Sequence, residues 1–213
     1  MKKLFTLVFS LMLFSVALFS QIRPQPPVSV EMMFGDKKSA ILMGMNKQVI
    51  GPIRYNSITS ASSYYSLDTG KPDLVMINTF LYQMHRSFGA GAGLQYHFLK
   101  GLVPSVSLNF GYSDPVWLVS VMPFINMRPE TNSENVAIVE FKPQLTEKLK
   151  LYTHALALYN HNITLGEHDR SFYYFRLGLS MGQFTVGAAA NIDYYGPAKF
   201  NENNYGGFVK INI

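Results

Sequence analysis

Cysteine is absent from the 213-residue chain. Its absence excludes disulfide bonds, thiol chemistry and lipid attachment through a cysteine. Charge is also scarce, because charged residues make up 15% of the chain and the formal net charge is +5. Residues 1–20 hold two lysines and no other charge, so the rest of the chain carries +5 minus 2, or +3. A positive balance this weak does not predict binding to nucleic acid.

Long hydrophobic runs are missing too, except at the start of the chain. Lys2 and Lys3 are followed by an apolar run over residues 4–19, which only three hydroxyl residues interrupt. A small residue, Ser20, then precedes the polar Gln21. The run is short for a membrane-spanning helix, so this order predicts a secretory signal peptide over residues 1–20. Residues 21–213 then suit a single domain.

Residues 173–195 show the clearest pattern in the sequence, an alternation of apolar with small or polar side chains. The apolar set of the first half is Tyr173, Phe175, Leu177, Leu179 and Met181. After Gly182 and Gln183 the alternation resumes from Phe184 to Tyr194. A period of two indicates strands, and the glycine-containing pair between them indicates a tight β-hairpin. Each arm has about 11 residues, the length at which a tilted strand crosses a bilayer.

Similar alternation, separated by turn residues, predicts about twelve strands, with ten as the alternative. The expected strands cover residues 28–35, 39–47, 53–67, 73–84, 87–98, 103–112, 116–127, 136–145, 149–160, 173–181, 184–195 and 205–213. The pattern is weakest over residues 53–67, which are mostly polar. With both termini on one side, the turns near residues 114, 147 and 182 would be short inner turns. Three polar stretches, 128–135, 161–170 and 196–204, would then be long outer loops.

The signal peptide, the amphipathic hairpins and the terminal strand GGFVKINI at residues 206–213 together resemble Gram-negative outer-membrane β-barrel proteins. The resemblance covers residues 21–213. It implies an all-β, transmembrane, antiparallel up-and-down barrel in the cell outer membrane, surrounded by outer-membrane lipid. It also implies the barrel-assembly machinery as a partner. Such barrels typically end in an aromatic residue, whereas this chain ends in Ile213.

Strand register predicts one polar cluster inside the barrel. If Leu145 and Leu149 flank a three-residue turn, paired residue numbers sum to 294 and Glu140 lies opposite His154. Face parity then puts Arg176 opposite or one step diagonal to His154. Glu140, His154 and Arg176 would thus face one another in the lumen. Such a cluster could be a plug that fills the lumen and fixes the register, or a charged constriction that selects solutes.

Four outward aromatic residues are predicted to form a lipid-facing girdle at the membrane interface. They are Trp117, Tyr173, Phe175 and Tyr194.

Signatures of outer-membrane enzymes are weak. Residues 159–162 are the nearest text to a lipid A deacylase motif, and they lack its serine. His97 could lie opposite Ser105 as an inward dyad, but packed lumen polar groups explain these two residues better. Residues 167–169, Glu-His-Asp, could bind a metal, although a solvated loop is the preferred interpretation. The sequence therefore predicts no catalytic residue, no metal site and no cofactor.

The resulting functional prediction is a non-enzymatic integral outer-membrane barrel with a structural role, or a narrow pore or transport-accessory role. Two alternatives stay open. One is a lipid-modifying enzyme of the outer membrane, and the other is a binding module that uses the external loops. No specific protein partner or solute follows from the sequence.

Overall fold

The computed structural model describes residues 25–66, 72–98 and 100–213, so the predicted signal peptide lies outside it. The described residues form twelve strands and no helix. These are β1 (Ser29–Gly35), β2 (Lys38–Ile50), β3 (Ile53–Tyr64), β4 (Asp73–His85), β5 (Phe88–His97), β6 (Gly101–Ser113), β7 (Trp117–Asn126), β8 (Asn132–Phe141), β9 (Lys150–Asn162), β10 (Glu167–Met181), β11 (Phe184–Tyr195) and β12 (Phe200–Asn212). No helix long and apolar enough to cross a membrane occurs in this part of the chain.

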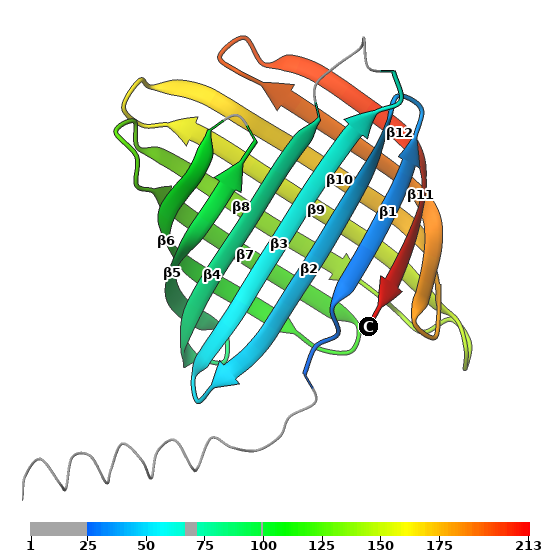
Figure 1. Ribbon diagram of the computed structural model, residues 1–213. Coiled ribbons are helices and arrows are strands. Elements are labelled where there is room, and N and C mark those ends of the chain that lie inside the picture. Colours follow the sequence, from blue (N-terminus) through cyan, green and yellow to red (C-terminus); the bar gives the residue numbers. More distant parts are fainter. Residues whose placement is uncertain (1–24, 67–71, 99) are drawn as a thin grey trace, which may run out of the picture.

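Every strand pairs antiparallel with its neighbours in sequence, and β1 pairs with β12 to close a barrel (Figure 1). The predicted closed barrel of twelve strands is therefore confirmed. The two ends of the described chain meet, because Val28 and Ile213 exchange backbone hydrogen bonds of 2.7 and 2.8 Å. We call this end of the barrel the inner end and the opposite end the outer end.

Alternation decides which face of each strand is exposed. On the β10–β11 hairpin, Leu177, Leu179 and Val186 are 58%, 43% and 54% exposed, as their predicted outward position requires. The interleaved Arg176 is 4% exposed. Gly182 connects the two strands at φ 60°, a conformation that glycine adopts without strain.

The predicted long outer loops are wrong. The outer connections near the three polar stretches are residues 127–131, 163–166 and 196–199, and the strands take up the rest of each stretch. Inner residues 142–149 form a longer connection than any of these three. Backbone pairing continues beyond the apolar band, but the side chains there no longer need to alternate. The sequence pattern that marks a strand therefore stops before the strand does.

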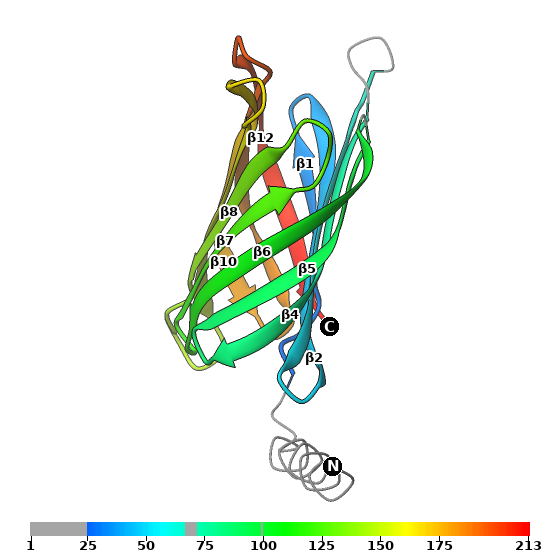
Figure 2. The same ribbon diagram turned by 90° about the vertical axis from the view of Figure 1, so that its left-hand side faces the viewer.

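The barrel is broad in Figure 1 and narrower after a quarter turn in Figure 2. Its opposite walls meet through inward side chains. An apolar cluster fills the middle of the lumen and is made of Val75, Ile77, Met122, Phe124, Val136, Leu156, Leu158, Phe172 and Tyr174, with Leu42, Ile58 and Ile138 against it. These residues come from β2–β4 on one wall and β7–β10 on the other, so the core of this barrel lies in its lumen.

Candidate functional site

A polar cluster around Glu140 occupies the inner part of the lumen. Glu140 on β8 lies opposite His154 on β9, in the predicted register. Its Oε1 atom is 3.3 Å from His154 Nδ1 and accepts hydrogen bonds from Tyr152 Oη at 3.1 Å and Lys210 Nζ at 3.3 Å. Its Oε2 atom accepts a hydrogen bond from Lys142 Nζ at 2.6 Å. Two ammonium groups thus compensate this buried carboxylate.

Arg176 lies opposite His154 on β10, again in the predicted register, but its guanidinium belongs to a second ion pair. Its Nε atom donates to Glu31 Oε1 at 2.6 Å, and one terminal nitrogen donates to Asn191 Oδ1 at 2.9 Å. Among the described residues, no hydrogen bond or ion pair joins Arg176 to Glu140 or His154. The three residues therefore occupy neighbouring inward positions in the predicted register, but Arg176 takes no part in the hydrogen bonds around Glu140. Glu31 lies on β1, which follows β11 and β12 around the barrel, and a hairpin-by-hairpin register does not reveal it.

Above this cluster, toward the outer end, the apolar cluster closes the lumen. Along β9, Tyr152 and His154 are followed on the same face by Leu156 and Leu158, each 3% exposed. Phe124 of β7 is 1% exposed at the same tier. Side chains of both walls meet here, so the middle of the lumen is packed rather than open.

Ion pairs cross the lumen again near the outer end. Arg170 on β10 contacts Asp73 of β4 at 2.7 Å and Asp193 of β11 at 2.8 Å. Lys38 on β2 contacts Glu202 of β12 at 3.4 Å. Sequence reasoning missed this network, because Arg170 and Glu202 lie in stretches that were expected to be loops. The lumen therefore has three tiers, with charged side chains at both ends and an apolar tier between them.

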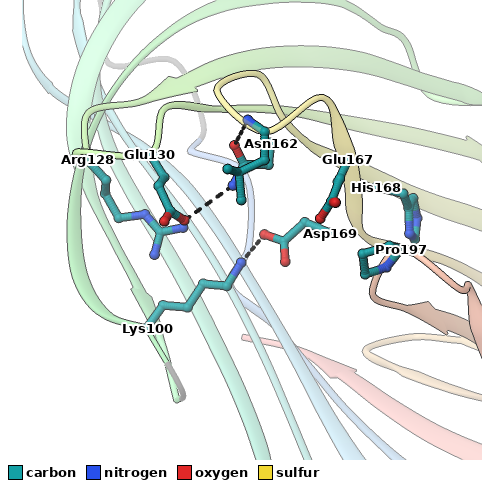
Figure 3. A pocket seen from close by; sticks show the side chains of 9 residues that line it. Lys100, Arg128, Glu130, Asn162, Glu167, His168, Asp169 and Pro197 are labelled. Atoms are coloured by element: carbon teal, nitrogen blue, oxygen red, sulfur yellow. Dashed lines mark hydrogen bonds and ion pairs between the residues drawn. The ribbon is translucent and has the colours of Figure 1, made fainter.

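A hollow of about 410 Å³ opens at the outer end of the barrel (Figure 3). It is lined by Lys100, Arg128, Glu130, Asn162, Leu165, Glu167, His168, Asp169 and Pro197. Lys100 forms an ion pair with Asp169, and Asn162 Nδ2 donates to Glu130 Oε2 at 3.4 Å. Burial, together with the positive charge of Arg128, lowers the pKa of Lys100 to about 8. The lining carries both signs of charge, so it offers partners to anionic and cationic groups alike.

His97 and Ser105 do not form the catalytic dyad considered from the sequence. His97 pairs with Gly101, whereas Ser105 pairs with Gly93, so the two residues are not opposite each other. No group of three or more His, Asp or Glu side chains within the described residues is placed to hold a metal ion.

His168 makes a contact that sequence reasoning missed. Its Nδ1 atom is 2.7 Å from the carbonyl oxygen of Gly196, and its Nε2 atom is 3.0 Å from Ser171 Oγ. A carbonyl only accepts, so Nδ1 carries the hydrogen in the neutral ring and Nε2 accepts from the Ser171 hydroxyl. A register shift between His168 and Arg170 brings the pair together, and no sequence signal marks that β-bulge. The polarity is that of a serine and its general base, although Ser171 is only 5% exposed.

The four aromatic residues of the predicted girdle lie on outward positions. Trp117 begins β7 at the inner end, with its ring centroid 4.4 Å from that of Phe141. Tyr173 and Tyr194 lie on the outer halves of β10 and β11, and their ring centroids are 6.4 Å apart. Phe175 occupies the next outward position toward the inner end, below Tyr173. Aromatic side chains therefore occur toward both ends of the apolar surface, as in membrane barrels.

A closed antiparallel barrel with an apolar outer surface and aromatic side chains toward both ends is a transmembrane β-barrel of the outer-membrane type. Solved structures with similar folds include the NanC porin, with 10% sequence identity over 87% of this chain and 99% of that chain at a TM-score of 0.53. LpxR from Salmonella typhimurium shares 8% identity over 87% of this chain and 99% of that chain, with a TM-score of 0.45. OmpT, an outer membrane protein of Vibrio cholerae, shares 10% identity over 88% of this chain and 96% of that chain, with a TM-score of 0.39.

No protein-family model matches the chain, and no curated protein matches it in sequence. At 10% identity, the likeness to the NanC porin extends to the fold alone. The protein is thus an outer-membrane β-barrel protein by fold.

Proposed function

We propose that this protein is a non-enzymatic outer-membrane barrel with a structural or transport-accessory role, and that its own side chains close its lumen at rest. The apolar tier around Phe124, Leu158 and Phe172 carries this proposal. These side chains are 1%, 3% and 4% exposed, and they fill the lumen between two charged tiers. A packed tier of this kind excludes water as a protein core does, so ions have no hydrated path through it.

The charged tiers also favour a closed lumen. A constriction that selects solutes needs charges that face water, whereas Glu31 and Arg176 are 3% and 4% exposed and are paired with each other. The charge that a passing solute would sense is therefore already compensated. The outer connections near residues 128, 164 and 198 are short, so these three offer little surface for a binding module built on external loops.

Conductance of the purified protein in planar bilayers tests the closed lumen. The wild-type barrel should give no steady ionic conductance. Replacing both Phe124 and Phe172 with alanine should give stepwise conductance, because two large side chains leave the packed tier. Phe110→Ala is the matched control, since Phe110 is 45% exposed on the outer surface. This variant should give no conductance. Stepwise conductance of the wild type would overturn the proposal.

The alternative function, a lipid-modifying enzyme, is favoured by one observation, the contact between His168 and Ser171. We assign this pair a structural role, tying the bulge of β10 to the turn before β12, because the hydroxyl is almost fully covered. The test is labelling by a fluorophosphonate probe, together with hydrolysis of phospholipid vesicles. The wild type should show neither. Labelling that Ser171→Ala abolishes and Ser180→Ala preserves would establish the enzyme instead.

A further inference from the structure

The outer wall of the barrel differs in polarity from one side to the other. On β10 and β11 the outward positions from Tyr173 to Met181 and from Phe184 to Tyr194 are apolar. On β3 and β4, side by side on the near wall in Figure 1, Ser57, Thr59 and Asn78 occupy outward positions. Ser57 pairs directly with Asn78, so the three form one polar patch.

The patch lies within the apolar band rather than at its edge. On β2, which borders β3, Ile41 and Met43 are each 40% exposed. Phe80 follows Asn78 on the outward face of β4 and is 57% exposed, and Leu94, which pairs with Asn78 from β5, is 45% exposed. Exposed apolar side chains therefore border Ser57 and Asn78 on both sides along the wall. Hydrocarbon would surround these polar groups if lipid covered this wall.

Asn78 has one hydrogen-bonding end without a partner. Its Oδ1 atom accepts from Tyr55 Oη at 2.7 Å and from Ser57 Oγ at 3.0 Å. Its Nδ2 atom donates to no acceptor among the described residues. If the amide is turned over, the oxygen takes the place of the nitrogen, so one end is left without a partner in either orientation. Thr153, an outward hydroxyl on β9, shows the contrast, because it donates to the carbonyl oxygen of Phe141 at 3.1 Å.

We propose that the patch around Ser57, Thr59 and Asn78 is the interface with a second copy of this chain. A lipid tail offers no hydrogen bond, so an amide facing hydrocarbon is costly. A second copy inserted in the same direction places its own Asn78 at the same depth in the membrane. An amide is both donor and acceptor, so two copies related by a two-fold axis along the membrane normal satisfy each other. The small side chains of Ser57 and Ala61 allow the walls to approach closely.

The absence of cysteine makes this interface directly testable. Ser57→Cys introduces a single thiol beside the axis, and Thr153→Cys introduces one on another wall. In phospholipid vesicles with few barrels per vesicle, an oxidant should cross-link the Ser57→Cys protein into dimers and leave the Thr153→Cys protein monomeric. Equal cross-linking at both positions would indicate random collision and would overturn the proposal.

Asn78→Leu separates the hydrogen bond from the surface around it. Energy transfer between labelled copies in vesicles should show a dimer dissociation constant about tenfold higher for Asn78→Leu than for wild type. Asn135→Leu is the matched control, since Asn135 is an outward amide near the outer end that donates to Ser133 Oγ at 3.4 Å. It should associate as the wild type does, and heat-modified gel mobility verifies folding of each variant. A monomeric wild type, with or without a lipid retained at the patch, would overturn the proposal, as would wild-type affinity of Asn78→Leu.

Discussion

Strands β10 and β3 lie on opposite walls of one barrel and are specified in different ways. On β10 the outward side chains are apolar and the inward ones include Arg170 and Arg176, each held in ion pairs. On β3 the side chains are polar on both faces, with Asn56 and Ser60 inside and Ser57 and Thr59 outside. Both strands nevertheless form regular antiparallel ladders with both neighbours.

The difference shows what alternation contributes to a membrane barrel. Backbone pairing is satisfied in both strands, so the ladder itself does not require alternating side chains. Alternation fixes which face meets lipid, because a slip by one residue would turn every side chain of β10 to the wrong face. On β3 a slip exchanges one polar set for another, so β2 and β4 fix its register. The cost of a substitution should therefore depend on the strand that carries it.

The largest expected effect is on the inward face of β10. Arg176→Ala leaves Glu31 buried without its partner, and we expect a loss of about 3–5 kcal/mol in the free energy of unfolding. The matched inward change on β3, Asn56→Ala, removes a hydrogen bond to the sulfur of Met122 and should cost about 1 kcal/mol. Urea unfolding in lipid vesicles measures both. Equal losses of stability in the two variants would mean that the inward contacts of β10 contribute no more to stability than those of β3.

A comparison with Lys100→Ala sharpens this result. Lys100 lies in the turn before β6 and forms an ion pair with Asp169 at the outer mouth, where both side chains are partly exposed. An ion pair that water reaches contributes about 1 kcal/mol or less. Arg176→Ala should therefore destabilise the barrel clearly more than Lys100→Ala does.

The outward face of β10 should give the next largest effect. Leu179→Arg places a charge on the lipid-facing surface near the inner end of β10, where the cost is smaller than the roughly 2–4 kcal/mol of the bilayer middle. Ser180→Arg, one residue along, faces the inner mouth of the lumen and should cost less. The yield of barrel refolded into vesicles, measured by gel mobility, compares the two variants. Equal tolerance of arginine at both positions would contradict the assigned faces.

The smallest effect concerns pH at the outer mouth, where Lys100, in the turn before β6, pairs with Asp169 of β10. The pKa of Lys100 falls from an ordinary 10.5 to about 8 in the folded barrel, because burial and Arg128 disfavour its ammonium form. Between these two values the unfolded chain binds the additional proton, so the contribution of Lys100 to stability rises with pH across this window. Wild-type protein should gain more stability between pH 7.5 and pH 10 than Lys100→Met in urea unfolding. An identical pH dependence of the two proteins would contradict the lowered pKa.

The sequence predicted the parts of the barrel that two-residue alternation controls. Strand count, the outward faces of β10 and β11 and the pairing of Glu140 with His154 all follow from local hairpin geometry. The partner of Arg176 does not, because Glu31 is 145 residues away and approaches only when the barrel closes. The outer ends of the strands were not predicted, because the side chains there are polar on both faces and show no two-residue alternation.

Local irregularities of the strands could not be predicted from the sequence either. The bulge that brings His168 to Ser171 shifts the register of β10 by one residue, and no residue type marks that shift. The outward Asn78 falls within a stretch assigned correctly as a strand. Its oxygen is paired with the hydroxyls of Tyr55 and Ser57, which only the assembled wall brings to it, and its Nδ2 atom is the end that no described residue pairs.

The ion pair between Glu31 and Arg176 bears on the order in which the barrel forms. Most ladders join strands that are adjacent in the chain, whereas β1 and β12 lie at its two ends, so their pairing closes the longest loop and has the highest contact order. β1 has only seven residues, so this seam is a short ladder of seven residue pairs. Arg176 reaches Glu31 only after β1 has docked. Because this buried guanidinium has no carboxylate partner until the barrel closes, the packing of the lumen is completed only when β1 pairs with β12.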